Sequence, residues 1–238
     1  MKINLLEEKL GINITKKLQE NFDNFEQLFR IYNSHTNLIS KNDEKNLFEK
    51  HIYDSLCLSK FFEKYTEVCK QDIKILDIGT GGGFPSLPLA IAYENYQIYP
   101  LDSIAKKIGF IELVQKELRL QNIHPTCKRA EDLPSAMKEN FDIVTSRAVA
   151  SLNMLLEYAI PFLKTGGYFI AYKSKTADTE IDEAQNALKV LNARVVDRIK
   201  YELPHEESFV RELLIIKKEK STPKQYPRKS GQAKKNPL

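Results

Sequence analysis

A glycine-rich segment at residues 77–85 carries the clearest chemical signal in this 238-residue chain. It reads DIGTGGGFP and follows an apolar run at 73–78 that predicts a strand. Glycines allow positive φ angles and let the backbone approach a ligand closely. A helix beginning after the segment, with Pro85 as its first residue, would direct unpaired N–H groups at the same point. The segment therefore predicts a nucleotide-like ligand held between a strand and a helix.

Two ligand classes compete for this segment. A nicotinamide-binding loop would need G-x-G-x-x-G, but Phe84 stands where the third glycine is required. The segment instead has an acid followed by glycines two, four and six residues later, namely Asp77, Gly79, Gly81 and Gly83. That spacing resembles motif I of the S-adenosyl-L-methionine-dependent methyltransferases, which makes S-adenosylmethionine the expected cofactor.

Two further acidic residues suit a bound nucleoside. Asp102 closes the second predicted strand, where a carboxylate can accept hydrogen bonds from both ribose hydroxyls of a cofactor. The same residue can cap a helix that starts near Ile104, and the two roles are compatible. In this fold the pair Ala130-Glu131, after the third predicted strand, lies near the adenine edge, where Glu131 can accept a hydrogen bond from an amine.

The end of the fourth predicted strand bears on the reaction itself. Enzymes that methylate exocyclic amines of bases commonly have a proline pair and an aromatic residue there, whereas this chain has TSRAVA at 145–150. A ring nitrogen such as guanine N7 has a free lone pair, so positioning and desolvation can supply most of the catalysis. We therefore expect no catalytic general base. Arg147 is expected at the carboxyl end of this strand, where it can pair with a carboxylate or a phosphate.

An open α/β sheet would bring these residues together. Five short apolar runs alternate with amphipathic segments, which predicts a mostly parallel sheet with helices on both faces. These runs lie at 73–78, 96–102, 124–128, 141–146 and 167–173.

The two ends of the chain depart from this alternation. Segments 193–203 and 208–218 have no helix between them and should pair as an antiparallel hairpin. Before the sheet, apolar residues at three- and four-residue steps predict helices around 14–32 and 43–66. The fold class is thus α/β and Rossmann-like, with a helical cap at 1–66, a cofactor-binding domain at 67–218 and a tail at 219–238.

Charge is distributed unevenly along the chain. The net charge is +4, yet residues 217–238 contain eight Lys and Arg against Glu219 alone, which is +7 and leaves −3 for residues 1–216. Such a tail suits a polyanion such as nucleic acid, although a solvated tail that aids solubility has the same composition. No apolar run is long enough for a membrane span, and three cysteines without a Cys-x-x-Cys spacing predict reduced thiols in the cytoplasm.

The motifs taken together resemble one family. In kind and order they are similar to the motifs of the RsmG (GidB) family. They are the segments 77–85, 101–103 and 145–150, the terminal YPR at 226–228 and the PL at 237–238. The resemblance runs nearly end to end, including HxxDSL at 51–56 in the cap. It implies a class I methyltransferase that modifies N7 of guanine 527 in 16S ribosomal RNA, either as free RNA or within the small ribosomal subunit.

The resemblance also implies site residues. Gly79, Phe84, Ala130, Glu131 and Arg147 would contact S-adenosylmethionine. We add three residues to these cofactor contacts because of their positions: Asp77, Gly81 and Asp102. The expected RNA contacts are Arg147, Lys173, Arg211 and Arg228.

Other interpretations remain open. One alternative is an RNA-binding ribosome assembly factor that shares only the fold with the enzymes, although the intact glycine set argues for turnover. His51, Asp54 and Ser55 suggest a catalytic triad, but no nucleophile elbow accompanies them, so we expect these residues to pack the cap or close over the cofactor. The four histidines are too scattered to predict a metal site.

Overall fold

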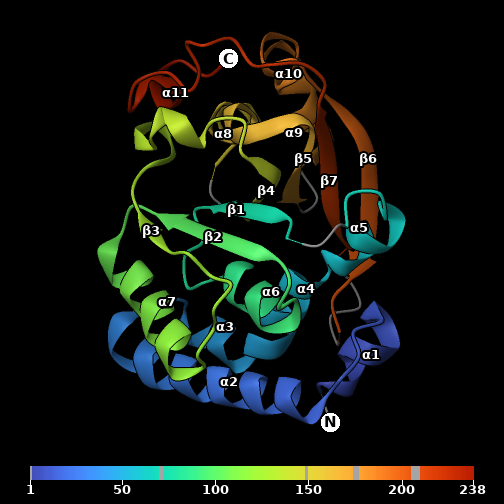
Figure 1. Cartoon of the computed structure of the whole chain (residues 1–238), viewed down its shortest axis with the longest axis vertical. Helices are drawn as coiled ribbons and strands as arrows, with labels where there is room; N and C mark the ends of the chain where they lie inside the picture. The colour runs from blue at the N-terminus through green and yellow to red at the C-terminus, as the bar shows by residue number, and fades with distance from the viewer. Residues whose placement is uncertain (1, 70–71, 148–149, 174–176, 205–209) are drawn as a thin grey trace.

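A mixed β-sheet runs through the middle of the molecule (Figure 1). The computed structural model describes residues 2–69, 72–147, 150–173, 177–204 and 210–238. Within these ranges the sheet has seven strands in the order β3-β2-β1-β4-β5-β7-β6. Their bounds are β1 Lys74–Ile78, β2 Gln97–Asp102, β3 Thr126–Cys127, β4 Phe141–Arg147, β5 Leu163–Lys173, β6 Ala193–Glu202 and β7 Val210–Lys218.

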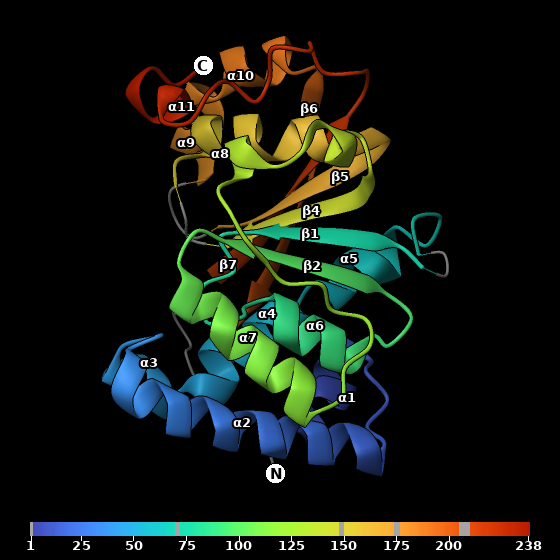
Figure 2. The ribbon, with the colours of Figure 1, turned by 60° about the vertical axis from the view of Figure 1, so that its left-hand side comes forward.

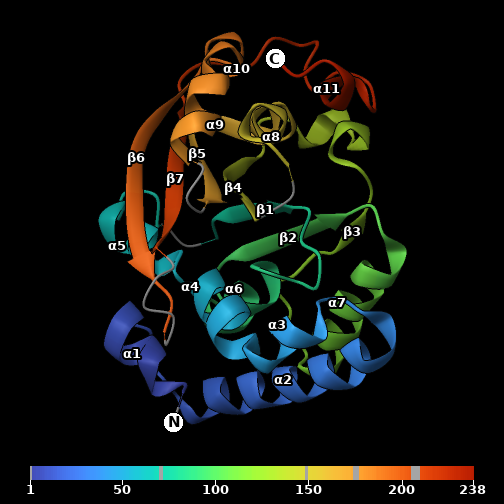
Figure 3. The same cartoon turned by 180° about the vertical axis from the view of Figure 1, so that it is seen from behind.

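The strand directions follow the sequence pattern. The pairs β1/β2, β1/β4, β2/β3 and β4/β5 are parallel, so their carboxyl ends meet at one edge. Strand β7 runs antiparallel to both β5 and β6, which confirms the predicted terminal hairpin, and the pair forms one edge of the sheet, at the left in Figure 3. Residues 208–209 of the predicted second hairpin strand lie outside the described residues.

Each face of the sheet supplies one hydrophobic core, because neighbouring residues of a strand point to opposite faces. In β1, Ile75 packs into one core, whereas Leu76 packs into the other. Figure 2 shows the resulting layers, with α8, α9 and α10 above the sheet and α2, α6 and α7 below it.

The lower layer contains the N-terminal cap as well as the first helices between strands. Its elements are α1 Asn4–Leu10, α2 Lys16–Thr36, α3 Lys41–Lys45, the π-helix η1 Phe48–Tyr53, α4 Asp54–Leu56, α5 Ser59–Lys64, α6 Ser86–Ala92 and α7 Ala105–Glu117. The long helix α2 starts where the Thr15 side chain accepts a hydrogen bond from the Leu18 N–H, and it ends at Asn37 in the left-handed region. Its buried face carries Phe22, Phe25 and Phe29 at helical spacing.

The upper layer consists of short helices. They are η2 Ala130–Asp132, η3 Ser135–Met137, α8 Leu152–Ala159, η4 Ile160–Phe162, α9 Ala177–Glu183, α10 Gln185–Val190 and α11 Gln232–Lys235. The tail after β7 returns across this layer, and Tyr226 and Ala233 are buried in it. No described helix is both long and apolar enough to cross a membrane.

Three local predictions need correction. The stretch 43–66 is helical, as predicted, but is divided into the four short elements α3, η1, α4 and α5. Helix α6 begins at Ser86, so Pro85 is its N-cap residue and not its first helical residue. The strand predicted at 124–128 is shorter than expected. Strand β3 covers only Thr126–Cys127, the two residues that pair with β2, and Cys127 lies beside Asp102.

Candidate active site

Two cavities flank the glycine loop at the carboxyl edge of the parallel strands. The larger of the two has a volume of about 520 Å³ and lies at the carboxyl ends of β1 and β2. This volume falls in the range of small-ligand sites. Six residues predicted from the sequence line it: Gly79, Gly81, Asp102, Ala130, Glu131 and Arg147. We call it the glycine-loop cavity.

The loop backbone explains the need for glycine at two positions of this cavity. Gly79 has φ 74° and Gly81 has φ 58°, a region that costs other residues about 1–2 kcal/mol. A Cβ built on Gly81 would have the Gly79 carbonyl oxygen, 4.0 Å away, as its nearest neighbour. The space above Gly81 is therefore open to a ligand.

Asp102 joins the loop to the next strand and helix. Its Oδ2 accepts hydrogen bonds from the Gly81 N–H at 3.1 Å and from Lys107 Nζ at 3.3 Å, and its Oδ1 accepts from the Ile104 N–H at 3.0 Å. The side chain thus supports the turn into α7 while it lines the cavity, and its contact with a cofactor ribose stays a prediction. Oδ1, which accepts a single hydrogen bond from the chain, has capacity for a further donor.

Asp77 is placed differently from the other acidic residue of the motif. It is fully buried beneath the loop, where Ser86 Oγ donates to Oδ2 at 2.7 Å and Thr145 Oγ1 donates to Oδ1 at 3.2 Å. Burial raises the pKa of Asp77 to about 6, with the hydrogen bonds from Ser86, Thr80 and Thr145 opposing the rise. Asp77 lines neither cavity, and its contacts hold the loop to β4 and α6.

Phe84 also lies outside the lining of the glycine-loop cavity. It is 3% exposed, and its ring centroid is 5.4 Å from that of Phe29, 5.9 Å from that of Phe25 and 4.9 Å from that of His51. These contacts fasten the loop to helix α2 of the cap. Phe84 borders the second cavity instead.

The second cavity, of about 350 Å³, opens on the cap side of the loop. It shares Gly79, Gly81 and Arg147 with the glycine-loop cavity, so a ligand in one would lie beside a ligand in the other. Its remaining wall is rich in charged residues from the cap and from β7, which include Asp43, Lys50, Asp54 and Arg211. We call it the cap cavity.

Arg147 stands between the two cavities and connects β4 to the cap. Its Nη1 donates to Asp54 Oδ2 at 2.9 Å and to the Lys50 carbonyl at 3.1 Å, and its Nη2 donates to His51 Nδ1 at 2.7 Å. Since a guanidinium only donates, His51 Nδ1 must be the acceptor and the imidazole is neutral with its proton on Nε2. Burial, reinforced by the charge of Arg147, accordingly lowers the pKa of His51 to about 3.

These contacts settle the arrangement of His51, Asp54 and Ser55. Ser55 Oγ donates to the His51 carbonyl at 2.5 Å, and Asp54 bonds to Arg147 and to the Tyr201 hydroxyl. The imidazole is hydrogen-bonded to Arg147 rather than to either triad partner. His51 and Asp54 thus connect the cap to β4 through Arg147, and the Ser55 carbonyl accepts a hydrogen bond from the Tyr172 hydroxyl of β5. Residues 148–149 of the adjoining sequence motif lie outside the described residues.

The predicted RNA contacts already have partners within the chain in several cases. Lys173 is buried, with its Nζ 2.6 Å from Glu180 Oε2, and Arg228 forms an ion pair with the buried Glu157. Arg211 is half-buried and lines the cap cavity, where its Nε has no hydrogen-bond partner in the described part of the chain. Of the four predicted RNA contacts, Arg147 and Arg211 both line the cap cavity, whereas Lys173 and Arg228 do not.

Several lining residues were not singled out from the sequence. Lys107, Lys128, Arg129 and Tyr158 all border the glycine-loop cavity. Lys107 follows Asp102 by five residues at the start of a predicted helix, which is a usable signal. Tyr158 comes from α8 and has no such signal, because only the packing of that helix on the sheet places it there. Among the described residues, no group of three or more His, Cys, Asp or Glu is placed to hold a metal.

Comparison with known proteins agrees with this architecture. A methyltransferase described as S-adenosylmethionine-dependent, from Aquifex aeolicus, superposes with a TM-score of 0.52 at 17% identity, covering 74% of this chain and 95% of that chain. TYW2 of M. jannaschii in complex with AdoMet gives a TM-score of 0.51 at 15% identity, covering 65% and 73%. At such low identity the likeness shows the fold, which is the class I Rossmann-like fold of methyltransferases.

Sequence comparison is more specific. A protein of Streptococcus pyogenes serotype M12 (strain MGAS2096), named ribosomal RNA small subunit methyltransferase G, is 41% identical over 235 residues. The match covers 97% of this chain and 96% of the relative. The family model described as rRNA small subunit methyltransferase G (GidB) matches residues 18–208. The chain therefore belongs to the rRNA small subunit methyltransferase G family.

Proposed function

We propose that this protein transfers a methyl group from S-adenosyl-L-methionine to N7 of guanine 527 in 16S ribosomal RNA. The observation that carries the proposal is the pair of cavities that meet at Gly79, Gly81 and Arg147. One suits a nucleoside cofactor, and the other, whose lining includes the cations Lys50, Arg147 and Arg211, suits a nucleotide. The methyl donor and the acceptor would then meet beside the glycine loop.

The residues of the glycine-loop cavity fit S-adenosylmethionine. The open space over Gly81 admits the ligand, Asp102 can accept the ribose hydroxyls, and Ala130 and Glu131 can border the adenine. When bound, the cofactor supplies an electrophilic methyl group on a sulfonium. The task of the chain is then to align this methyl group with an incoming nitrogen and to exclude water.

The surroundings of the cap cavity support a reaction that needs no general base. N7 of guanine attacks through its own lone pair and carries no proton to be removed. His51 Nδ1 is occupied by Arg147, and Asp77 is sealed beneath the loop. Arg147 and Arg211 can bind the phosphates that flank the base and bring N7 toward the loop.

The substrate side of the proposal is ribosomal RNA or the small ribosomal subunit in the cytoplasm. Support comes from the family and from five lysines of the tail, all exposed, that can contact phosphates. These are Lys220, Lys224, Lys229, Lys234 and Lys235. The three cysteines of the chain are free thiols, in keeping with this location.

A direct test compares methyl transfer to isolated 16S RNA and to whole 30S particles, with the product mapped by mass spectrometry. We expect one methyl group at guanine 527, and none when that guanine is replaced by 7-deazaguanine, which lacks the nitrogen. Methylation of the 7-deaza substrate would place the reaction on another atom. Tight RNA binding without turnover on either substrate would favour the assembly-factor alternative.

A further inference from the structure

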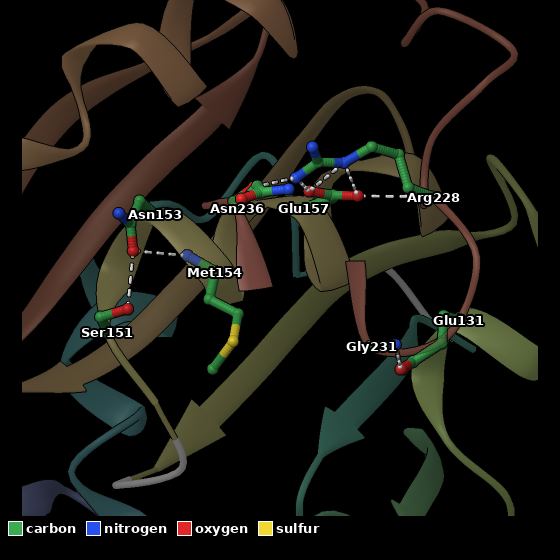
Figure 4. A network of polar contacts seen from close by, with 8 residues as sticks. All are labelled: Glu131, Ser151, Asn153, Met154, Glu157, Arg228, Gly231 and Asn236. Carbon is green, nitrogen blue, oxygen red and sulfur yellow. Dashed lines mark hydrogen bonds and ion pairs between the residues drawn. The ribbon is translucent and has the colours of Figure 1, made fainter. Parts of the chain in front are cut away.

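The basic tail does not project from the body but is fastened to it through a buried carboxylate. Glu157 of α8 is fully buried, and Arg228 binds it with Nη2–Oε2 2.6 Å and Nε–Oε1 2.9 Å (Figure 4). The backbone N–H of Arg228 adds a third bond to Oε1 at 2.8 Å. A buried carboxylate is costly without such partners, so this ion pair fixes the position of the tail at Arg228.

Neighbouring contacts continue the fastening along the tail. Tyr226 is buried, and its carbonyl accepts a hydrogen bond from Lys138 Nζ at 2.6 Å. On the other side of Arg228, Ala233 of α11 is buried against the upper layer. Residues 226–233 thus form a docked segment, which we call the tail clamp.

The tail clamp reaches the wall of the glycine-loop cavity at Glu131. The Gly231 N–H and the Ser230 Oγ both donate to Glu131 Oε1, at 3.3 and 3.1 Å (Figure 4 shows the Gly231 contact). Arg129 Nη1 donates in turn to Ser230 Oγ at 3.4 Å. Both of these hydrogen bonds to Glu131 therefore arrive at one oxygen.

This arrangement orients the carboxylate. Within the part of the chain that the structure describes, Oε2 of Glu131 makes no hydrogen bond, while Oε1 is held from the tail side. Glu131 lines the cavity, so Oε2 is left to accept a donor from a ligand there. The exocyclic amine of adenine is such a donor, whereas the carbonyl oxygen at the same position of hypoxanthine would be repelled.

We propose that the tail clamp is a positioning element of the cofactor site, which holds Glu131 so that the site prefers adenine over hypoxanthine nucleosides. The inference rests on the proposed function, because it takes the ligand of the glycine-loop cavity to be an adenine nucleoside. Arg228 does not line the cavity and acts through the placement of Ser230 and Gly231.

The test measures equilibrium binding of S-adenosyl-L-homocysteine and S-inosyl-L-homocysteine to the full chain by calorimetry. Three variants are compared with the unchanged chain. Arg228→Met breaks the anchor, Ser230→Ala removes one bond to Glu131 from an exposed residue, and Lys189→Met is the control, which removes one positive charge at an exposed residue outside the tail. The urea midpoint of each variant confirms that it is folded.

We expect Arg228→Met to weaken S-adenosyl-L-homocysteine about tenfold and Ser230→Ala about threefold, the loss expected for weakened hydrogen bonds to a charged group. Binding of S-inosyl-L-homocysteine should change much less, so the preference for adenine falls, and Lys189→Met should match the unchanged chain. If Arg228→Met is unfolded, Ser230→Ala alone decides the outcome.

Other results separate the two proposals. Equal losses for both ligands, or an unchanged preference in Arg228→Met and Ser230→Ala, would overturn the role of the clamp while leaving the cofactor assignment intact. An unchanged chain that binds neither nucleoside would instead overturn the proposed function, and the clamp inference with it.

Discussion

Gly81 combines a left-handed backbone with open space above it, and the two properties can be tested separately. Gly81→Ala should cost about 1 kcal/mol of stability, because φ 58° disfavours a side chain. It should also weaken S-adenosylmethionine binding about tenfold, since the new methyl group points into space that the ligand needs. Calorimetric titration and urea unfolding measure the two effects.

A matched control for Gly81→Ala exists at the other end of the molecule. Gly11, the C-cap residue of α1, has φ 64° and nothing within 4 Å of an added Cβ. Gly11→Ala should therefore lose similar stability but keep full cofactor affinity. If Gly81→Ala binds the cofactor as well as Gly11→Ala does, the loop is not the binding surface.

The buried carboxylate of Asp77 should give the chain a characteristic pH dependence. Its folded pKa is about 6, above the ordinary 3.8, so its contribution to stability is fully present below pH 3.8 and is lost as the pH rises through 6. Asp77→Asn removes this dependence. The unfolding free energy of the unchanged chain, relative to Asp77→Asn, should thus rise by about 3 kcal/mol from pH 7 to pH 3.5.

Urea unfolding at several pH values measures this difference. Asp178→Asn gives a comparison of opposite sign, because Arg198 lowers the pKa of the Asp178 carboxyl and the stability that it contributes is lost as the pH falls. A flat difference between the unchanged chain and Asp77→Asn would show that Asp77 does not titrate in this range.

At the scale of elements, Arg147 holds the π-helix η1 against strand β4. Arg147→Met would leave Asp54, whose side chain is 2% exposed, without its charged partner, which costs about 3–5 kcal/mol. Lys164→Met breaks the half-exposed pair with Asp142 and should cost less than about 1 kcal/mol. Urea unfolding of both variants gives the comparison, and equal losses would mean that the connection is not structural.

The elements that were predicted correctly are those with a strong local pattern. The strands β1, β2, β4 and β5 follow short apolar runs, and the hairpin of β6 and β7 follows from the lack of room for a helix. The helical character of 43–66 was predicted, but its division into short elements, with interruptions at 46–47 and 57–58, was not. Arg147 bonds to the Lys50 carbonyl and to His51, and neither bond is visible in the local sequence.

In the candidate site, too, local patterns predicted some features and missed those that depend on tertiary contacts. Glycine spacing pointed to Gly79 and Gly81, which line the cavity, but it did not reveal that Asp77 and Phe84 lie beneath or beside the loop. The motif reflects residues that shape a loop as well as residues that touch a ligand, and spacing alone does not separate these roles. The cofactor contacts of all the named residues, and the division into 1–66, 67–218 and 219–238, stay predictions.

At the scale of the whole molecule, the charge of the tail can be separated from its docking. Replacing its five exposed lysines by glutamine leaves the Arg228–Glu157 pair in place. We expect RNA binding to weaken and its salt dependence to flatten, by about 0.7–0.9 in log–log slope for each phosphate that the tail no longer neutralises. Cofactor affinity should not change, because the bonds to Glu131 remain.

Filter binding over a range of salt concentrations measures the slope. The control replaces five exposed lysines outside the tail, which removes the same charge: Lys9, Lys16, Lys17, Lys116 and Lys189. If both sets of replacements flatten the slope equally, RNA responds to net charge and not to the tail.

The Arg228–Glu157 pair also orders events while the chain is being synthesised. The two residues are 71 positions apart, so Glu157 leaves the ribosome well before its partner exists. Until then α8 carries a carboxylate whose burial is costly, which disfavours closure of the layer above the sheet around it. We therefore expect the outer wall of the cofactor site to form late, so that a nascent chain gains its full cofactor affinity only after residue 228 has emerged.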